Sequence, residues 1–204
     1  MKFPVPLSQG IFKKRYKRFF TDIEFDGEIL TAHCPNTGSM MGLKDPDQLC
    51  RFSHVDDPNR KLKYTLQMVK TKTSWVGVNT ALPNKLVAEL FESNPLPHWK
   101  KFDCLQSEVK IKDKTRIDLV LWNSKKHEIK KWNHKNLEAP LHLIEVKNVT
   151  LAEEGIAYFP DAVTTRGLKH LEDLIEMQSK GFTCEMLYVV QRTDCDVFKP
   201  ARQI

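Results

Sequence analysis

Apolar and polar residues alternate in several short runs over the first 80 residues of the chain. The runs at 21–25 and 28–32 flank Asp26-Gly27, and an Asp-Gly pair between two alternating runs predicts a β-hairpin. Further runs at 49–53 and 64–69 predict strands, and Asn36-Thr37-Gly38 predicts another turn. Several short strands joined by turns predict a small β-barrel, and the oligonucleotide-binding fold is one such shape.

A helical pattern begins near Pro83 and ends at Asn94-Pro95. Strands are then predicted at 104–111, 116–122, 141–146 and 184–190, with a second helix at 162–180. In this helix we expect Asp161 as the N-cap residue. We expect its buried stripe to consist of Leu168, Leu171, Leu174 and Ile175. The order helix, strand, strand, strand, helix, strand predicts a mixed-sheet domain, so the fold class is α+β or α/β with domains at 1–82 and 83–204.

The stretch 123–140 is polar and rich in lysine. It shows no apolar periodicity and separates two apolar strands. We therefore expect residues 125–135 to form a mobile loop whose deletion leaves the fold intact.

Positive charge is concentrated in the first part of the chain. Residues 1–82 contain 13 Lys and Arg against 8 Asp and Glu, an excess of five, whereas residues 83–204 contain 19 against 18. A basic module beside a nearly neutral one suits a protein that holds a polyanion and acts on it, although a merely basic surface is the alternative. The predicted DNA-binding residues in this part are Lys13, Lys14, Arg15, Tyr16, Lys17 and Arg18, because cations can meet phosphates while aromatic rings stack on bases.

The cysteines and the hydropathy predict a reduced, cytoplasmic protein with no membrane partner. Five cysteines occur without a Cys-x-x-Cys pair, and no apolar run approaches the roughly 18 residues of a membrane span. Zinc ligation by His33-Cys34 or by Cys50 with His54 is disfavoured because the usual paired spacing is missing.

Two acidic residues stand inside otherwise apolar predicted strands, Asp118 in 116–122 and Glu145 in 141–146. Burying an unpaired carboxylate costs on the order of several kcal/mol, and a bound cation is one reason to keep it there. The strand period of two places Glu145 and Lys147 on one face. The alternative is an exposed edge strand on which these two residues form a surface ion pair.

This set of side chains suits the hydrolysis of a phosphodiester. Mg²⁺ prefers one or two carboxylates and keeps several waters, and a metal-bound water becomes a nucleophile. A lysine beside it orients that water or stabilises negative charge on phosphorus oxygens. We therefore predict Asp118 and Glu145 as ligands of Mg²⁺ or Mn²⁺ and Lys147 as a third catalytic residue.

Four further residues are candidates for the same site. Glu89 on the first helix and Glu108 on the preceding strand could complete the catalytic carboxylates, whereas each alone is an ordinary solvated charge. Arg166 and Lys169 lie near one face of the second helix with Asp173, and the two cations could hold the scissile phosphate. The alternative for this face is plain exposure to solvent.

The chain resembles the sugar fermentation stimulation protein A family over essentially its whole length. The matching motifs are RYKRF at 15–19, AHCPNTGSM at 32–40, VGVNT at 76–80, SEVK at 107–110, RID at 116–118, EVKNVTL at 145–151 and FPDAVTTRGLKHL at 159–171. The resemblance implies an N-terminal oligonucleotide-binding domain and a C-terminal PD-(D/E)xK nuclease-like domain. It places Asp118, Glu145 and Lys147 at the nuclease-motif positions, and Glu108 and Glu89 at acidic positions of the pattern.

The sequence alone leaves two functions open. The first is a Mg²⁺- or Mn²⁺-dependent DNA endonuclease, which the intact Asp, Glu and Lys set favours. The second is a non-catalytic regulator of sugar (maltose) genes that binds DNA without sequence preference, including single-stranded or structured DNA. Whether the protein forms a homo-oligomer is also left open.

Overall fold

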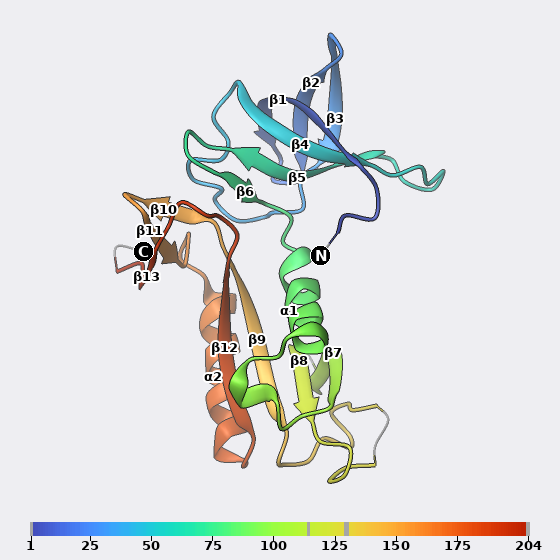
Figure 1. The fold of residues 1–204 in the computed structure, drawn as a ribbon, viewed down its shortest axis with the longest axis vertical. Helices are drawn as coiled ribbons and strands as arrows, with labels where there is room; N and C mark the ends of the chain where they lie inside the picture. Colours follow the sequence, from blue (N-terminus) through green and yellow to red (C-terminus); the bar gives the residue numbers. More distant parts are fainter. Residues whose placement is uncertain (1, 114, 129–130, 203–204) are drawn as a thin grey trace. The chain divides into compact units, whose positions relative to one another are not determined.

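The protein is described here by a computed structural model that covers residues 2–113, 115–128 and 131–202. It divides into two compact units (Figure 1). Unit 1 comprises residues 1–81, 148–163 and 190–204, and unit 2 comprises 82–147 and 164–189. The predicted boundary between residues 82 and 83 lies next to the first crossing between the units. Two segments of the predicted second domain, 148–163 and 190–204, belong to unit 1.

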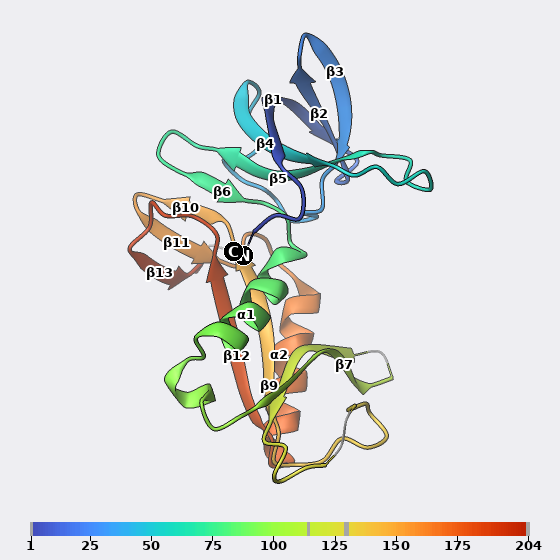
Figure 2. The same ribbon diagram turned by 45° about the vertical axis from the view of Figure 1, so that its right-hand side comes forward.

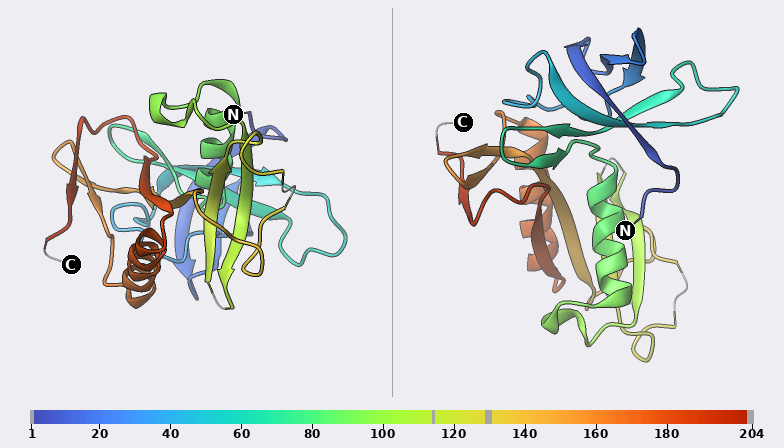
Figure 3. Two further views of the ribbon diagram at one scale, coloured as in Figure 1. Left: turned by 90° about the horizontal axis from the view of Figure 1, so that it is seen from below. Right: turned by 45° about the horizontal axis from the view of Figure 1, so that its top comes forward.

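Unit 1 contains a curled sheet of six strands. These are β1 (Leu7–Tyr16), β2 (Phe20–Phe25), β3 (Glu28–His33), β4 (Gln48–His54), β5 (Tyr64–Lys70) and β6 (Trp75–Gly77). They lie in the order β3-β2-β1-β4-β5-β6, and β3 also pairs with β5, so the sheet closes on itself (Figure 3). Asp26 and Gly27 have φ values of +51° and +82°, which confirms the predicted hairpin because its tight turn needs positive φ at both positions. The predicted β-barrel is thereby confirmed.

A small second sheet of unit 1 was not predicted. It consists of β10 (Leu151–Glu153), β11 (Ile156–Phe159) and β13 (Val197–Pro200), in the order β10-β11-β13. The chain near these strands is bonded to the first sheet, since the Gly77 N–H donates to the Gln191 carbonyl oxygen at 2.9 Å. A side chain at Gly77 would meet the Gln191 side chain, which would have to move to make room for it.

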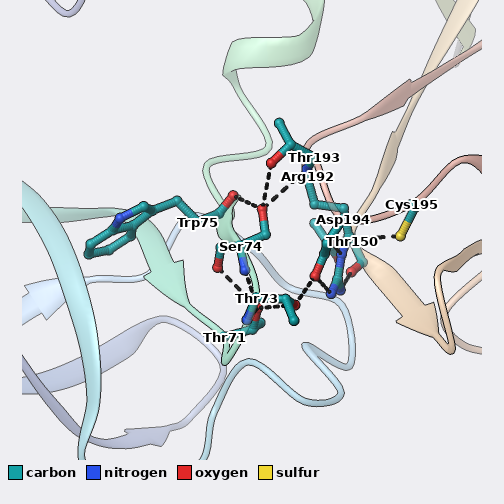
Figure 4. A network of polar contacts seen from close by, with 9 residues as sticks. All are labelled: Thr71, Thr73, Ser74, Trp75, Thr150, Arg192, Thr193, Asp194 and Cys195. Atoms are coloured by element: carbon teal, nitrogen blue, oxygen red, sulfur yellow. Dashed lines mark hydrogen bonds and ion pairs between the residues drawn. The ribbon is translucent and has the colours of Figure 1, made fainter.

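A polar network holds the β5–β6 turn against residues 192–194 (Figure 4). The Thr193 N–H donates to Ser74 Oγ at 3.1 Å, and the Thr73 hydroxyl donates to Asp194. The Arg192 guanidinium binds both carboxylate oxygens of Asp194, which holds the pKa of that carboxyl below its usual range. The network explains why the end of the chain belongs to the N-terminal unit.

Unit 2 is built on a four-stranded sheet with the order β12-β9-β8-β7. Its elements are α1 (Leu82–Ser93), the 3₁₀ turn η1 (Pro97–Trp99), β7 (Cys104–Lys112), β8 (Thr115–Trp122), β9 (His142–Val149), α2 (Thr165–Ser179) and β12 (Thr183–Val190). Strands β7, β8 and β9 are antiparallel, and α1 and α2 cover opposite faces of the sheet (Figure 2). Leu174 of α2 packs with Leu143, while Val87 of α1 packs with Ile144, as alternation along β9 requires. The predicted order of elements is confirmed, with β10 and β11 inserted before α2.

Two predictions about α2 are wrong. The N-cap residue is Thr164, whose side chain accepts a hydrogen bond from the Gly167 N–H, whereas Asp161 accepts from the Ser39 N–H and hydroxyl. Of the predicted buried stripe only Leu174 is buried; Leu168, Leu171 and Ile175 are 58%, 43% and 60% exposed.

The prediction that residues 125–135 can be deleted is also wrong, as far as the structure describes them. Trp132 is 1% exposed and packs edge-to-face against Trp122 in the core. The Gln106 side chain donates to the Trp132 carbonyl and accepts from its N–H. This segment therefore contributes to the core of unit 2. Residues 129 and 130 lie outside the described residues.

Candidate active site

Three carboxylates lie in one row across β7, β8 and β9. The register Ser107–Leu119 and Val109–Ile117 places Glu108 opposite Asp118. The paired residues of β8 and β9 end at Leu119–Ile144, so Asp118 and Glu145 are the next residue on each of these neighbouring strands. Like charges on neighbouring strands destabilise a sheet, so positive charge close to these carboxylates would stabilise it.

Asp118 is held in place by the neighbouring strand. Its Oδ2 accepts a hydrogen bond of 2.7 Å from the Val146 N–H, next to Glu145. Burial and the charge of Glu145 raise the pKa of Asp118, although the hydrogen bond from Val146 opposes that rise. Glu145 itself is 2% exposed. Two neighbouring carboxylates in a poorly solvated place are the arrangement that a divalent cation stabilises.

The amide of Asn84, at the start of α1, joins two of these carboxylates. Its Nδ2 donates to Asp118 Oδ1 at 2.9 Å and lies 3.4 Å from Glu108 Oε1. Glu108 has a φ of +56°, a left-handed conformation that is costly for a side chain of this kind and is often found at functional sites. Asn84 was not predicted as a site residue, because its position at the start of a helix gives no hint of what it faces.

Lys147 and His170 both contact the buried glutamate. Lys147 Nζ is 2.6 Å from Glu145 Oε1, and His170 Nδ1 meets the same oxygen. His170 lies on α2, one turn after Arg166, and the Arg166 Nε donates to His170 Nε2 at 3.4 Å. Sequence reasoning missed His170; its i+4 spacing from Arg166 was the available signal. The Lys147 and Glu145 side chains form a largely buried pair at the site, which excludes the alternative of a surface ion pair.

An open pocket of about 550 Å³ is lined by two of the three carboxylates, Glu108 and Asp118, whereas Glu145 and Lys147 do not line it. The pocket is lined by both acidic and basic side chains. The lining residues are Glu108, Lys110, Asp113, Thr115, Arg116, Asp118, Arg166, Lys169 and His170. Carboxylate oxygens suit a hard cation such as Mg²⁺, and the exposed cations Arg166 and Lys169 suit the oxygens of a phosphate. Asp173, which was expected beside them, instead binds Lys112 and Thr115.

Glu89 lies on α1, five residues after Asn84, and is exposed. It does not line the pocket described above. Its assignment to the catalytic set stays a prediction without geometric support.

The basic cluster of unit 1 is partly neutralised by its own surroundings. Lys13 Nζ lies 2.6 Å from Asp47, and Lys14 Nζ lies 3.3 Å from Asp22. The Arg15 guanidinium donates to the carbonyl oxygens of Arg18 and Asn36, and the Tyr16 ring stacks on Phe20. Lys17 and Arg18 are exposed in the β1–β2 turn, so these two present their charge to solvent most directly.

No helix within the described residues is long and apolar enough to cross a membrane.

Comparison with known proteins agrees with the fold and the motifs. The family model described as "Sugar fermentation stimulation protein RE domain" matches residues 81–204, and the "SfsA N-terminal OB domain" matches residues 14–78. A sugar fermentation stimulation protein homolog of Bdellovibrio bacteriovorus is 49% identical over 214 residues, covering 100% of this chain and 83% of the relative. A homolog of Crocosphaera subtropica is 45% identical, covering 96% of this chain and 78% of the relative.

A solved structure has the same fold. The structure of Pyrococcus furiosus SfsA in complex with Ca²⁺ matches with a TM-score of 0.83 and 22% identity, covering 100% of this chain and 80% of that one. The predicted combination of an oligonucleotide-binding domain with a mixed-sheet domain is confirmed. The barrel, the mixed sheet and the matching motifs together show that this chain belongs to the sugar fermentation stimulation protein family.

Proposed function

We propose that this protein is a Mg²⁺- or Mn²⁺-dependent DNA endonuclease. The observation that carries the proposal is that two carboxylates lie close together on neighbouring strands. Asp118 accepts a hydrogen bond from the Val146 N–H, next to Glu145, and Lys147 lies on the same face as Glu145. Without a bound cation, two neighbouring carboxylates repel each other and destabilise the sheet. A divalent cation binds both and removes this repulsion. The Ca²⁺ named for the Pyrococcus furiosus relative is a hard cation of the kind that oxygen ligands select.

The residues divide the work of phosphodiester hydrolysis between them. Asp118 and Glu145 would hold the cation, which would acidify a bound water and polarise the phosphate. Lys147 orients the attacking water, and the pocket's Arg166 and Lys169 hold the phosphate oxygens. Water adds its oxygen to phosphorus as the bond from phosphorus to the leaving sugar oxygen breaks, and that oxygen takes up a proton.

His170 and Asn84 position the acidic residues. His170 contacts the Glu145 oxygen that also meets Lys147, and Asn84 fixes one oxygen of Asp118. The barrel of unit 1, with Lys17 and Arg18 exposed, supplies contacts to DNA without sequence preference. All five cysteines are free, which fits work in the reducing cytoplasm.

The alternative is a DNA-binding regulator of sugar-utilisation genes without catalysis. The contacts of Lys147 and His170 with Glu145 favour it, because they already balance that charge without a metal. The names of the relatives refer to sugar fermentation and to no nuclease activity.

Cleavage assays separate the two functions. Single-stranded, duplex and branched DNA are incubated with the protein in Mg²⁺, Mn²⁺ or a chelator. Glu145→Gln and Lys147→Ala should each reduce cleavage by at least about 10²-fold, the scale expected for losing one preorganised group. The matched control is Glu172→Gln on the exposed surface of α2, which should cleave like the wild type. The absence of cleavage by wild type on all three substrates, together with no binding of Mg²⁺ or Mn²⁺ in calorimetry, contradicts the proposal.

A further inference from the structure

A second group of metal-type ligands lies in unit 2, away from the carboxylate row. It consists of His98, His142 and Glu185, and we call it the histidine cluster. Glu185 Oε2 is 2.8 Å from His142 Nε2 and 3.1 Å from His98 Nε2. One ligand atom from each residue lies within 4.8 Å of the others, the only such group of three among the described residues.

The histidine cluster is on the other face of the sheet from the candidate active site. His142 shares the face of β9 that carries Ile144, and Glu185 shares the face of β12 that carries Leu187. Both of those apolar residues pack on the α1 side with Trp99. Glu145 points to the opposite face, so the histidine cluster cannot be part of the carboxylate row.

Neighbouring groups orient the ligands of the histidine cluster. The Trp99 Nε1–H donates to Glu185 Oε2 at 2.9 Å, and Thr183 Oγ1 lies 2.8 Å from His142 Nδ1. Such outer contacts fix the rotamer and tautomer of ligands at metal sites.

The threonine contact bears directly on the state of His142. The Thr183 hydroxyl is also 3.2 Å from the Leu141 carbonyl oxygen. Where this hydroxyl donates to the carbonyl, it accepts from His142 Nδ1–H and the Nε2 lone pair faces the Glu185 carboxylate. Where it donates to Nδ1 instead, Nε2–H donates to Glu185. A lone pair and a carboxylate repel each other unless a positive charge lies between them, and a histidine bound to a metal through Nε2 is in the first of these tautomers.

We propose that His98, His142 and Glu185 bind a divalent transition-metal ion of the Zn²⁺ class. Two imidazole nitrogens and one carboxylate oxygen are a ligand set that Zn²⁺ accepts and that Mg²⁺ and Ca²⁺ disfavour. Tetrahedral zinc with bonds of about 2.0–2.1 Å places its ligand atoms about 3.3 Å apart. The observed separations from Glu185 Oε2, 2.8 and 3.1 Å, are slightly shorter than this, and the two imidazoles offer nitrogens within 4.8 Å of each other.

The ion would reach this site from solvent and tie separate segments together. The His98 side chain is 55% exposed, whereas those of His142 and Glu185 are 10% and 20% exposed. The three ligands come from η1, β9 and β12, so a bound ion fastens the turn after α1 to the sheet. The alternative is that a proton, and not a metal ion, lies between His142 Nε2 and Glu185 Oε2. The histidine cluster would then be a set of charge-assisted hydrogen bonds.

Zinc titration of the full chain tests the proposal. The protein is stripped with a chelator, dialysed, and titrated with Zn²⁺ in millimolar Mg²⁺, which occupies oxygen-ligand sites. We expect one equivalent of Zn²⁺ to bind with micromolar or tighter affinity, measured by calorimetry and by competition with a chromophoric chelator. His98→Ala removes an exposed ligand without disturbing the core and should weaken binding at least about 100-fold, above the 10- to 100-fold range of outer-contact losses.

Two further variants sharpen the test. Thr183→Val removes the contact to His142 Nδ1 and should weaken Zn²⁺ binding about 10- to 100-fold. His54→Ala removes an exposed histidine of β4 and should leave binding unchanged. Failure of wild type to bind one equivalent, or equal affinity in wild type and His98→Ala, overturns the proposal. Tetrahedral absorption of bound Co²⁺ that disappears in His98→Ala supports it independently of affinity.

Discussion

Replacing Lys147 with alanine tests whether this lysine balances the buried charge of the candidate active site. Lys147 Nζ lies 2.6 Å from Glu145 Oε1, and the two side chains are only 14% and 3% exposed. Removing one partner of a buried ion pair costs about 3–5 kcal/mol, because the other charge is left uncompensated. His170 also contacts Glu145, so we expect the lower end, about 3 kcal/mol, for Lys147→Ala in chelator.

The same variant should respond to metal more strongly than the wild type. A cation held by Asp118 and Glu145 supplies the missing positive charge, and a ligand at 100 times its Kd stabilises the folded state by about 2.7 kcal/mol. Most of the loss in Lys147→Ala should therefore be recovered in saturating Mg²⁺. For a protein of this size, about 3 kcal/mol corresponds to a Tm change of about 6–12 °C. The assay is thermal and urea unfolding, each in chelator and in Mg²⁺.

The double variant Glu145→Gln with Lys147→Ala is the matched control. It keeps the shape of the glutamate but carries neither charge, so Mg²⁺ should no longer change its stability appreciably. Two results would refute the reasoning. Either Lys147→Ala unfolds like the wild type in chelator, or Mg²⁺ stabilises the double variant as much as it stabilises Lys147→Ala.

Three further perturbations follow from the structure. Burial and the charge of Glu145 raise the pKa of Asp118, so the stability of the chelated protein should fall as the pH rises through that raised pKa. Asp118→Asn should lose this part of the pH dependence in urea unfolding, and an unchanged pH profile would contradict the reasoning. Trp132→Ala should destabilise unit 2 by about 3–5 kcal/mol because the ring is 1% exposed, and a urea midpoint near that of wild type would count against it. Neutralising Lys17 and Arg18 should weaken DNA binding and reduce the slope of log affinity against log salt by about 1.8, since each phosphate contact contributes about 0.9. Neutralising Lys13 should change this slope less, because Lys13 is already paired with Asp47. An equal change of slope would show that the pairing with Asp47 does not persist.

The elements that the sequence predicts well have long, regular apolar patterns. Strands β7, β8 and β9 and helix α1 are of this kind, and Asp118 and Glu145 stood out as acids within such patterns. Strands β10, β11 and β13 are only three or four residues long, too short for alternation to identify them. Strand β11 also pairs with β13, a partner distant in sequence that a local pattern does not identify.

Helical periodicity identified an apolar face of α2 without showing which face packs. Leu168, Leu171 and Ile175 form a regular stripe but are exposed, while Asp173 and Met177 are buried. The buried aspartate is explained by its bonds with Lys112 and Thr115, on β7 and β8. A local pattern cannot anticipate such partners, and the same limit applies to Trp132, a single aromatic residue in a charged stretch.

The contacts of Glu145 bear on how the two proposed functions can be separated. In this structure Lys147 and His170 share its Oε1. In the proposed enzyme Asp118 and Glu145 would hold a cation, whose positive charge would balance Glu145 and allow Lys147 to contact the attacking water. A regulator without catalysis would not need a cation here, because Lys147 and His170 already balance the charge of Glu145. Metal affinity therefore discriminates between the two functions more directly than a cleavage assay, which also depends on choosing the right DNA substrate.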